Sequence, residues 1–461
     1  MKRVAAVSLL LALLAAGASA REAPPPPGTP RDFVLPAKQT IVLDNGLKVT
    51  FLEHGSVPLA TLMAVVRTGS IDEGTRTWLS DLTVEMLKEG TAARSAADIA
   101  RQAAEMGGSL GVGAGAEQTT VGITVLSERA ADGAALVADV LRNPAFPESE
   151  LPRIVANFER NLSIALRDPD SQAGAALARL VYGDHPFGRT FPEPGQLASH
   201  TIADLRSFHA AQFGAARTHV YVAGRFDRPT LEAALRRAFA DWRPGPPPTD
   251  NPPRASSALQ LALVDRPGAP QSSLRMAVAA PHPAHADYFP FTLTNTLFGG
   301  AATSRLYANL REDKGYTYTP NSSIRAFRRL ATWVVSADVT TEHTADSLRE
   351  VYSEIERLRR EPPPAAELGA IKAYRAGLFV VSNSSPQGLL GQLAFMDLHG
   401  LPDEFLTQWV RNVHAVTPAQ VSEMVARYID PSRMSVVVVG DLGKVAEPVK
   451  ALPQLRGAAG R

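Results

Sequence analysis

The chain has 461 residues, a length typical of two or three domains rather than one. Its 47 basic and 46 acidic side chains nearly balance, which excludes the strong positive field expected of a nucleic-acid-binding protein. Hydrophobic residues make up 45% and charged residues 20%, the proportions of a globular rather than a disordered protein. Cysteine is absent, which excludes disulfides, thiolate metal sites and a lipid-modified cysteine.

Residues 1–20 have the pattern of a secretory signal peptide. A basic start precedes an apolar run over residues 4–16, and the segment ends in the small residues Ala18–Ala20. The apolar run is shorter than the roughly 20 residues of a spanning helix, so we expect cleavage after Ala20 and no remaining membrane span. Retention as a membrane anchor is the alternative. We therefore expect a periplasmic or secreted protein that begins with a proline-rich spacer, residues 21–37.

Residues 38–242 carry strand and helix patterns that do not alternate strictly. The Asn45-Gly46 dipeptide lies between two strand-like runs and predicts a hairpin closed by a type I′ turn. The hydrophobic periodicity predicts further strands over 60–67 and 118–126, and helices over 78–89, 96–106, 127–141 and 148–166. This segment is predicted to form one domain.

Residues 243–257 are rich in proline, which disfavours both helix and central strand, and are predicted to be a linker. The second domain is predicted over 258–455. Its patterns indicate a strand over 332–339 and helices over 344–359 and 364–379. The predicted fold class is α+β, with helices packed on a mainly antiparallel sheet in each domain.

An internal repeat relates the two domains. The segment from Thr201 to Gly224 matches the segment from Thr417 to Gly440 without a gap, and seven residues are identical in register. Each threonine is positioned to cap a helix, and each valine-rich run is typical of a buried strand that ends at glycine. Duplication of a domain is the economical interpretation.

Several motifs together resemble the pitrilysin/insulinase family of zinc peptidases, in the branch that includes the mitochondrial processing peptidases. The motifs are Arg67–Gly74, Trp78–Thr91, Gly107–Leu110, Arg167–Asp170, His185–Gly188, Leu297–Gly300, Ser304–Leu306 and Leu310–Tyr318. The resemblance covers most of residues 38–445. It implies two homologous domains that form half of a clam-shell chamber.

The family's zinc motif is degenerate in this chain. H-x-x-E-H supplies two histidine ligands and a glutamate base from one helical face. By the resemblance, the two histidines fall on Asp81 and Glu85, the base falls on Val84, and the third ligand falls on Asn161. A valine cannot accept a proton from water. We therefore expect no zinc in this chain. Gly111 also replaces an asparagine that contacts substrate in the family.

Two interpretations of the replacing residues stay open. Asp81, Glu85 and Asn161 would form an all-oxygen cluster, which suits calcium or magnesium better than zinc. Alternatively, the two carboxylates line a solvated wall and tolerate weak i,i+4 repulsion. The ten histidines are scattered and offer no better metal site.

Arg311 and Tyr318 occupy the positions of an Arg/Tyr pair that, in the family, binds substrate carbonyl oxygens at the zinc site of a facing domain. The resemblance implies this role for both residues. Guanidinium and phenol groups are suitable donors to a carbonyl oxygen that gains negative charge. Tyr316 is the nearby competitor for the tyrosine position, and surface and packing roles are the alternatives for both residues.

Two functional hypotheses follow. In the first, the chain is the non-catalytic, substrate-binding subunit of a heterodimeric zinc metallopeptidase that acts on unfolded peptides. A homologous partner with intact H-x-x-E-H then holds the zinc, and this chain contributes Arg311 and Tyr318. In the second, the chain is an inactive structural or peptide-binding scaffold with no role in hydrolysis. The presence of the Arg/Tyr pair favours the first hypothesis.

Overall fold

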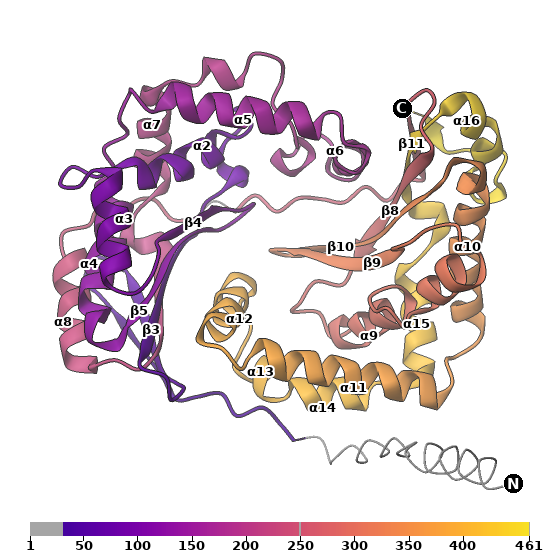
Figure 1. Cartoon of the computed structure of the whole chain (residues 1–461). Coiled ribbons are helices and arrows are strands. Elements are labelled where there is room, and N and C mark those ends of the chain that lie inside the picture. Colours follow the sequence, from indigo (N-terminus) through magenta and orange to yellow (C-terminus); the bar gives the residue numbers. More distant parts are fainter. Residues whose placement is uncertain (1–30, 249, 461) are drawn as a thin grey trace, which may run out of the picture.

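The computed structural model describes residues 31–248 and 250–460, so the predicted signal peptide 1–20 lies outside the described residues. The chain folds into two halves at opposite sides of Figure 1, the first over residues 38–242 and the second over residues 258–455. Within the described ranges, no helix has both the length and the apolar character needed to cross a membrane.

The first half contains one sheet and seven numbered helices, α2 to α8 in Figure 1, with short 3₁₀ turns between some of them. Its elements are β1 (Lys38–Val42), β2 (Lys48–Glu53), β3 (Leu59–Val66), α2 (Leu79–Met86), α3 (Ala96–Glu105), β4 (Gly111–Ala114), β5 (Thr119–Leu126), α4 (Ala130–Arg142), α5 (Leu151–Ala165), α6 (Pro169–Tyr182), α7 (Ile202–Gln212), β6 (Thr218–Gly224) and α8 (Arg228–Phe239).

The second half repeats this plan with additional helices. Its elements are β7 (Gln260–Asp265), β8 (Gln271–Ala280), α9 (Tyr288–Phe298), a π-helix (Tyr307–Asp313), β9 (Asn321–Phe327), β10 (Leu330–Thr340), α10 (Thr344–Arg360), α11 (Ala365–Ser382), α12 (Pro386–His399), α13 (Glu404–Thr407), α14 (Trp409–Ala415), α15 (Pro418–Tyr428), β11 (Ser435–Gly440), α16 (Leu442–Lys450) and β12 (Ala459–Gly460).

The two sheets share one topology in five of their six strands and differ in the edge strand, β1 in the first and β12 in the second. The first has the order β1-β2-β6-β3-β5-β4 and the second the order β12-β7-β11-β8-β10-β9. In each sheet the strand from the repeat pairs in parallel with one neighbour, β6 with β2 and β11 with β7, and antiparallel with the other. The remaining pairs are antiparallel except β12 with β7. The predicted α+β class with mainly antiparallel sheets is confirmed.

The internal repeat is visible in the local structure. Helices α7 and α15 begin one residue after Thr201 and Thr417, and both threonines form capping boxes with the third residue of their helix. The valine-rich runs that follow are the central strands β6 and β11, which are almost entirely buried. The two repeats are therefore equivalent in structure as well as in sequence.

The hairpin β1–β2 exists, but its turn is not the predicted type I′. The turn runs from Leu43 to Gly46, whose amide donates to the Leu43 carbonyl at 2.9 Å, and only Gly46 has a positive φ, of 87°. The Asn45 side chain explains the difference, because it donates to the carbonyl oxygens of Phe239 and Trp242 at 2.7 and 2.9 Å. This tertiary contact selects a longer turn than the dipeptide alone predicts.

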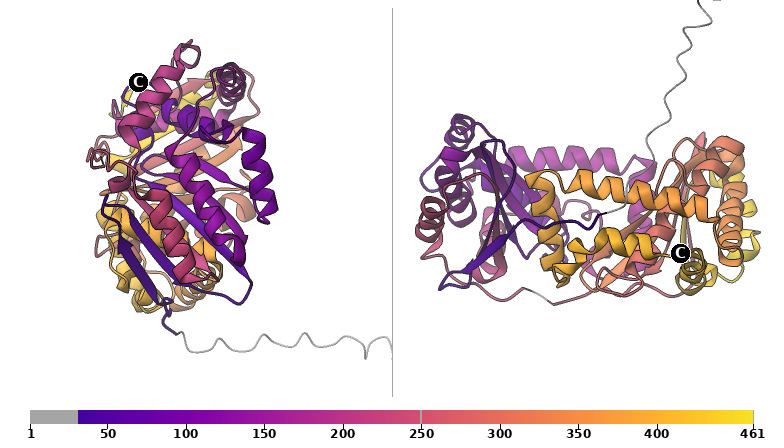
Figure 2. Two further views of the ribbon diagram at one scale, coloured as in Figure 1. Left: turned by 90° about the vertical axis from the view of Figure 1, so that its left-hand side faces the viewer. Right: turned by 90° about the horizontal axis from the view of Figure 1, so that it is seen from below.

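Two helices cross from one half to the other. Helix α6 belongs to the first half in sequence, yet Ala173, Leu177 and Val181 share a hydrophobic cluster with Ala277 and Val437 of the second sheet. Helix α12 makes the reciprocal crossing and packs against β3 and β6 of the first sheet. Figure 1 and the right view of Figure 2 show the long helices α5 and α11 leading to these crossings.

The segments outside the two halves are also anchored. The linker, 243–257, has no helix or strand in its described residues, and the Ser256 amide donates to the Val181 carbonyl at 2.8 Å. The described part of the leader, 31–37, is not a free spacer. Phe33 packs edge-on against Phe379 of α11, with ring centroids 5.3 Å apart, and the leader therefore contacts the second half.

Replacing Leu393 of α12 by alanine should destabilise the whole chain. Leu393 is 4% exposed and belongs to the cluster that joins α12 to Met63 and Tyr221 of the first sheet. We expect Leu393→Ala to lower the free energy of unfolding by about 2–5 kcal/mol, measured by urea titration. Leu378→Ala on α11 is the control, because Leu378 is 40% exposed and should cost less than about 1 kcal/mol. Equal effects would contradict the crossing contact.

Candidate functional site

The helix with the degenerate motif, α2, begins from a strained residue. Trp78 precedes α2 with φ of 68°, a left-handed conformation that is uncommon for a bulky residue. Its indole Nε1 donates to the Thr190 carbonyl at 3.0 Å, and its ring packs edge-on against Phe158 of α5 at 5.9 Å. These contacts hold the start of α2 against the rest of the first half.

The predicted motif positions do not converge on one point. Val84 is 2% exposed and packs into the core of the first half. Glu85 forms an ion pair with Lys88 at 2.7 Å, while Asn161 lies exposed on α5. Asp81 instead lies beside Ser80, whose hydroxyl oxygen is 3.3 Å from the Asp81 carboxylate. The side chains that replace the zinc ligands are thus engaged with different neighbours.

These residues do not fit a zinc ion. Zinc in this arrangement favours imidazole donors around one centre, and here the three positions offer two carboxylates with different neighbours and an exposed amide. Within residues 31–248 and 250–460, no group of three or more His, Asp or Glu side chains is placed to hold a metal ion.

A buried carboxylate beside α2 was not singled out from the sequence. Glu73 is 6% exposed and accepts hydrogen bonds from the Ser80 amide at 3.3 Å and the Ser80 hydroxyl at 3.1 Å. Burial and, next, the charge of Asp81 raise the pKa of Glu73 to about 7. Burial also raises the pKa of Asp81. The only signal for Glu73 was its place in the Arg67–Gly74 motif.

Glu73 and Asp81 line a polar cavity of about 250 Å³ in which the two halves meet. The second half contributes Arg325 and Phe327 from the end of β9. Phe327 stacks on Phe187 of the first half with ring centroids 4.3 Å apart. The β9–β10 hairpin therefore closes one side of the degenerate site from within the same chain.

The structure brings Arg311 and Tyr318 together. Arg311 lies in the π-helix, and its guanidinium carbon is 4.4 Å from the centre of the Tyr318 ring. Tyr318 is 73% exposed, and the Arg311 side chain is 30% exposed. The competitor Tyr316 points elsewhere, because its ring stacks on His343 at 4.1 Å. The geometry pairs Arg311 with Tyr318 rather than with Tyr316.

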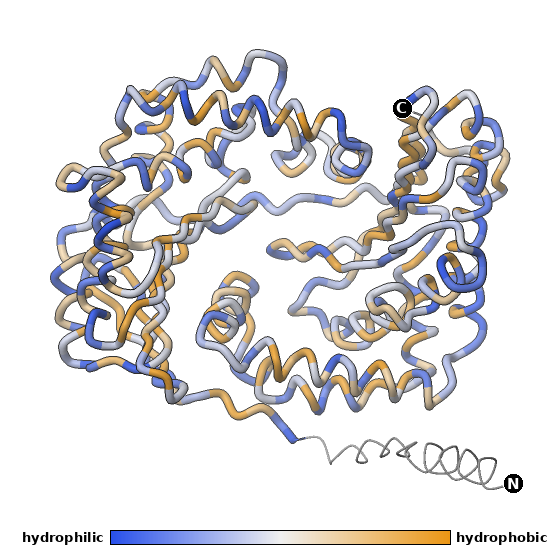
Figure 3. The backbone as a smooth tube through the Cα atoms, viewed as in Figure 1, coloured by the Kyte–Doolittle hydropathy of each residue, from blue (hydrophilic) through white to orange (hydrophobic). Residues whose placement is uncertain are grey.

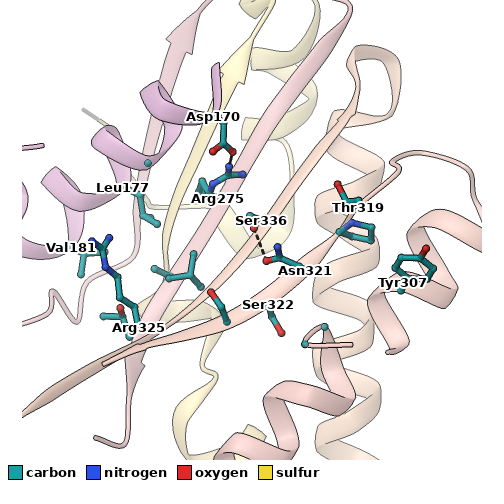
Figure 4. Close-up of a pocket in the computed structure, with 18 of the residues that line it drawn as sticks. Asp170, Leu177, Val181, Arg275, Tyr307, Thr319, Asn321, Ser322, Arg325 and Ser336 are labelled. Atoms are coloured by element: carbon teal, nitrogen blue, oxygen red, sulfur yellow. Dashed lines mark hydrogen bonds and ion pairs between the residues drawn. The ribbon is translucent and has the colours of Figure 1, made fainter. Parts of the chain in front are cut away.

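A larger cavity, of about 710 Å³, is lined in part by neighbours of this pair in the chain (Figure 4). It is formed by the crossing helix α6, strands β8, β9 and β10, and the loop 299–302. Tyr307 and Thr319 from the Arg/Tyr segment line it as well. Its glycine pair permits close packing, because a Cβ on Gly299 would lie 2.7 Å from the Ser322 amide nitrogen.

Polar groups cover the sheet side of this cavity. Arg275 is 8% exposed and forms an ion pair with Asp170 of α6, and the Ser336 hydroxyl donates to Asn321 at 2.8 Å. Arg325 is exposed, and no carboxylate in the described residues pairs with it. The cavity could not be predicted from sequence, because it joins residues more than a hundred positions apart across the two halves.

The raised pKa of the buried Glu73 predicts that the free energy of unfolding depends on pH. Its pKa of about 7 lies above the ordinary 4.5, so between these values the folded chain holds a proton that the unfolded chain has released. The free energy of unfolding should therefore fall as pH rises through this window, by an amount on the order of 2–3 kcal/mol.

Glu73→Gln should remove most of this fall, measured by urea titration between pH 4.5 and 8. Glu105→Gln is the matched control, because the Glu105 side chain is 62% exposed. If Glu73→Gln and the unaltered chain show the same pH dependence, the raised pKa of Glu73 is wrong.

Comparisons with known proteins agree with this architecture. A family profile described as Insulinase (Peptidase family M16) matches residues 49–194, and one described as Peptidase M16 inactive domain matches residues 199–374. A relative named as an uncharacterized zinc protease in Mycobacterium tuberculosis is 29% identical over 445 residues, covering 94% of this chain and 99% of the relative. One from Streptomyces coelicolor is 24% identical and covers 87% of this chain and 89% of its own length.

Solved structures show the same fold. The crystal structure of a peptidase M16 inactive domain from Pseudomonas fluorescens has a TM-score of 0.82 and 25% identity, and the match covers 87% of this chain and 98% of that one. A protease from Helicobacter pylori has a TM-score of 0.81 at 15% identity and covers 88% of this chain and 100% of its own. The two profiles lie one after the other and together span most of both halves. The chain therefore belongs to the M16 (insulinase) family of peptidases, and it is built from two M16 domains.

Proposed function

We propose that this chain is the non-catalytic, substrate-binding subunit of a two-chain zinc peptidase. A homologous partner with intact H-x-x-E-H would hold the zinc, and this chain would supply Arg311 and Tyr318 to the partner's active site. The observation that carries the proposal is a contrast. The zinc positions of α2 are buried or engaged with other neighbours, whereas Arg311 and Tyr318 are stacked on each other and reachable from solvent.

The exposed pair has the chemistry that this role needs. Arg311 has one ionic contact in the described residues, with Glu312 at 3.5 Å, and Glu312 is itself 64% exposed. Such a surface pair is weak, so the guanidinium can donate to a peptide carbonyl oxygen. The exposed Tyr318 phenol offers a second donor. Two donors aimed at one oxygen would stabilise the negative charge that develops during hydrolysis.

Exposed apolar side chains on α11, one of which lines the larger cavity, favour a peptide substrate without fixed structure. Tyr374 lines the larger cavity and is 43% exposed, and Leu378 and Val381 follow it on α11 at 40% and 69% exposure. Figure 3 shows how apolar and polar residues alternate along α11. Exposed apolar surface of this kind is typical of binding sites. An extended peptide could cover these side chains while its carbonyl groups reach Arg311.

The predicted signal peptide adds a location to the proposal. We propose that the pair forms and acts in the periplasm or outside the cell. The alternative function, an inactive structural or peptide-binding scaffold, is also consistent with the match of residues 199–374 to a domain described as inactive. The two functions differ in one measurable respect, since only a true subunit changes the hydrolytic rate of a partner.

Purified alone, the chain should bind less than stoichiometric zinc and leave unfolded protein intact. The reason is that α2 offers neither histidine ligands nor a base. Zinc is measured by mass spectrometry after dialysis, and hydrolysis by release of fluorescein from labelled casein. If this chain alone hydrolyses casein and a chelator abolishes the hydrolysis, the proposal is wrong.

Mixed with a homologous chain from the same cell that carries intact H-x-x-E-H, it should form a heterodimer that hydrolyses labelled casein. Arg311→Ala should then lower kcat/KM at least tenfold, because a donor to the developing oxyanion is lost. Dimer formation, followed by light scattering, should be unchanged.

Arg360→Ala is the matched control for this measurement. Arg360 is 73% exposed on α10 and forms an ion pair with Glu356 at 2.6 Å. It should leave kcat/KM within about twofold. Equal rates for Arg311→Ala and Arg360→Ala would favour the scaffold function.

A further inference from the structure

The segment that carries Arg311 is a π-helix with firm anchors. Leu310 is fully buried in the core of the second half. The Asn309 side chain donates to Glu350 and Glu354 of α10 at 3.0 and 2.9 Å. The wide turn is closed by the Lys314 amide, which donates to the Asn309 carbonyl at 2.9 Å. Wide turns of this kind are rare and are frequently found at functional sites.

Arg311 is held between two aromatic rings. Its guanidinium carbon lies 4.6 Å from the centre of the Tyr307 ring and 4.4 Å from that of the Tyr318 ring. Tyr307 and Arg311 are four residues apart and share one face of the turn. Tyr307 is half-buried against the cavity wall, whereas Tyr318 is 73% exposed. The two rings therefore differ, one being fixed and the other free to meet a ligand.

We propose that Tyr307 is a positioning residue that holds the Arg311 guanidinium flat, so that its N–H groups face a peptide carbonyl oxygen. The role rests on the proposed function of Arg311. An arginine side chain has several rotatable bonds, and ordering them when a ligand binds costs conformational entropy. A ring 4.6 Å from the guanidinium carbon restricts the side chain before binding and attracts the cation through its π face.

The contact needs the ring of Tyr307 and not its hydroxyl group. The attraction comes from the aromatic face, so phenylalanine at this position should preserve it and leucine should not. This difference separates positioning from a general structural role, since Tyr307→Leu keeps an apolar side chain of similar burial. It also separates positioning from direct hydrogen bonding by the phenol, which Tyr307→Phe would remove.

The stack itself can be tested without any activity. In the mature chain labelled with ¹⁵N-arginine, the Nε–H resonance of Arg311 is identified by its loss in Arg311→Lys. Ring currents should shift this proton upfield in the unaltered chain and in Tyr307→Phe, and the shift should shrink in Tyr307→Leu. Tyr374→Leu, which changes a tyrosine of the same cavity, should leave the resonance in place. If the Arg311 resonance does not move in Tyr307→Leu, the Tyr307 ring does not stack on the Arg311 guanidinium.

The role of the stack is tested by binding of an unfolded probe, fluorescein-labelled carboxymethylated α-lactalbumin, followed by anisotropy. Tyr307→Phe should stay within about twofold of the unaltered chain, and Tyr307→Leu should weaken binding about three- to tenfold. In the Arg311→Ala background, Tyr307→Leu should have no further effect. If the losses of probe binding in the two single variants add in the double variant, Tyr307 contacts the peptide directly and is not a positioning residue.

The two proposals fail in different ways. If Arg311→Ala binds the probe as well as the unaltered chain and the pair with its partner keeps its rate, the proposed function fails. The resonance of Arg311 would still report whether Tyr307 holds the guanidinium. If instead Arg311→Ala weakens binding and Tyr307→Leu does not, the proposed function stands and positioning by Tyr307 is wrong.

Discussion

The reciprocal exchange of helices α6 and α12 is the constraint on which the rest of the structure depends. Each helix leaves its own half and covers part of the inner face of the other sheet. Neither sheet can bury that face alone, so the two M16 domains are coupled through packing rather than through the linker. Close packing leaves little freedom for one half to shift against the other.

The same exchange creates the cavities that surround the candidate site. The larger cavity has α6 of the first half as one wall and strands of the second half as the other. A second contact between halves, Phe327 on Phe187, closes the degenerate site. The chain therefore presents its binding groups on a frame to which both halves contribute. Packing of this kind suits donors such as Arg311, whose effect depends on orientation.

The repeated and local parts of the fold could be predicted from the sequence. Thr201 and Thr417 were identified as helix caps because capping depends on a few adjacent residues. The central strands were identifiable because valine runs ended at Gly224 and Gly440. The hairpin turn was mispredicted because the Asn45 side chain bonds to α8, nearly two hundred residues away. Local signals were reliable where no distant contact competed with them.

In the candidate site, too, residues in a local motif could be predicted, whereas residues that depend on contacts made by folding could not. Arg311 and Tyr318 could be located from a compact motif, but the choice of Tyr318 over Tyr316 required the structure, in which the Tyr318 ring lies against Arg311 and the Tyr316 ring stacks on His343. Glu73 could not be identified as a site residue from the sequence, because its burial and raised pKa arise only when α2 folds against it. Tyr307 was missed for a similar reason, since its contact with Arg311 depends on the π-helical turn. Sequence spacing alone would place that segment in an ordinary helix.

The crossing of α12 also orders the events of synthesis. The first sheet is complete once β6 has left the ribosome, yet the helix that covers its inner face is encoded more than 150 residues later. Until then Leu52, Met63 and Tyr221 face water. Domains usually fold in the order in which they are made, and exposed apolar surface on a partly folded domain invites aggregation. The newly made first half thus remains unfinished until the second is present, and the chain matures as one unit.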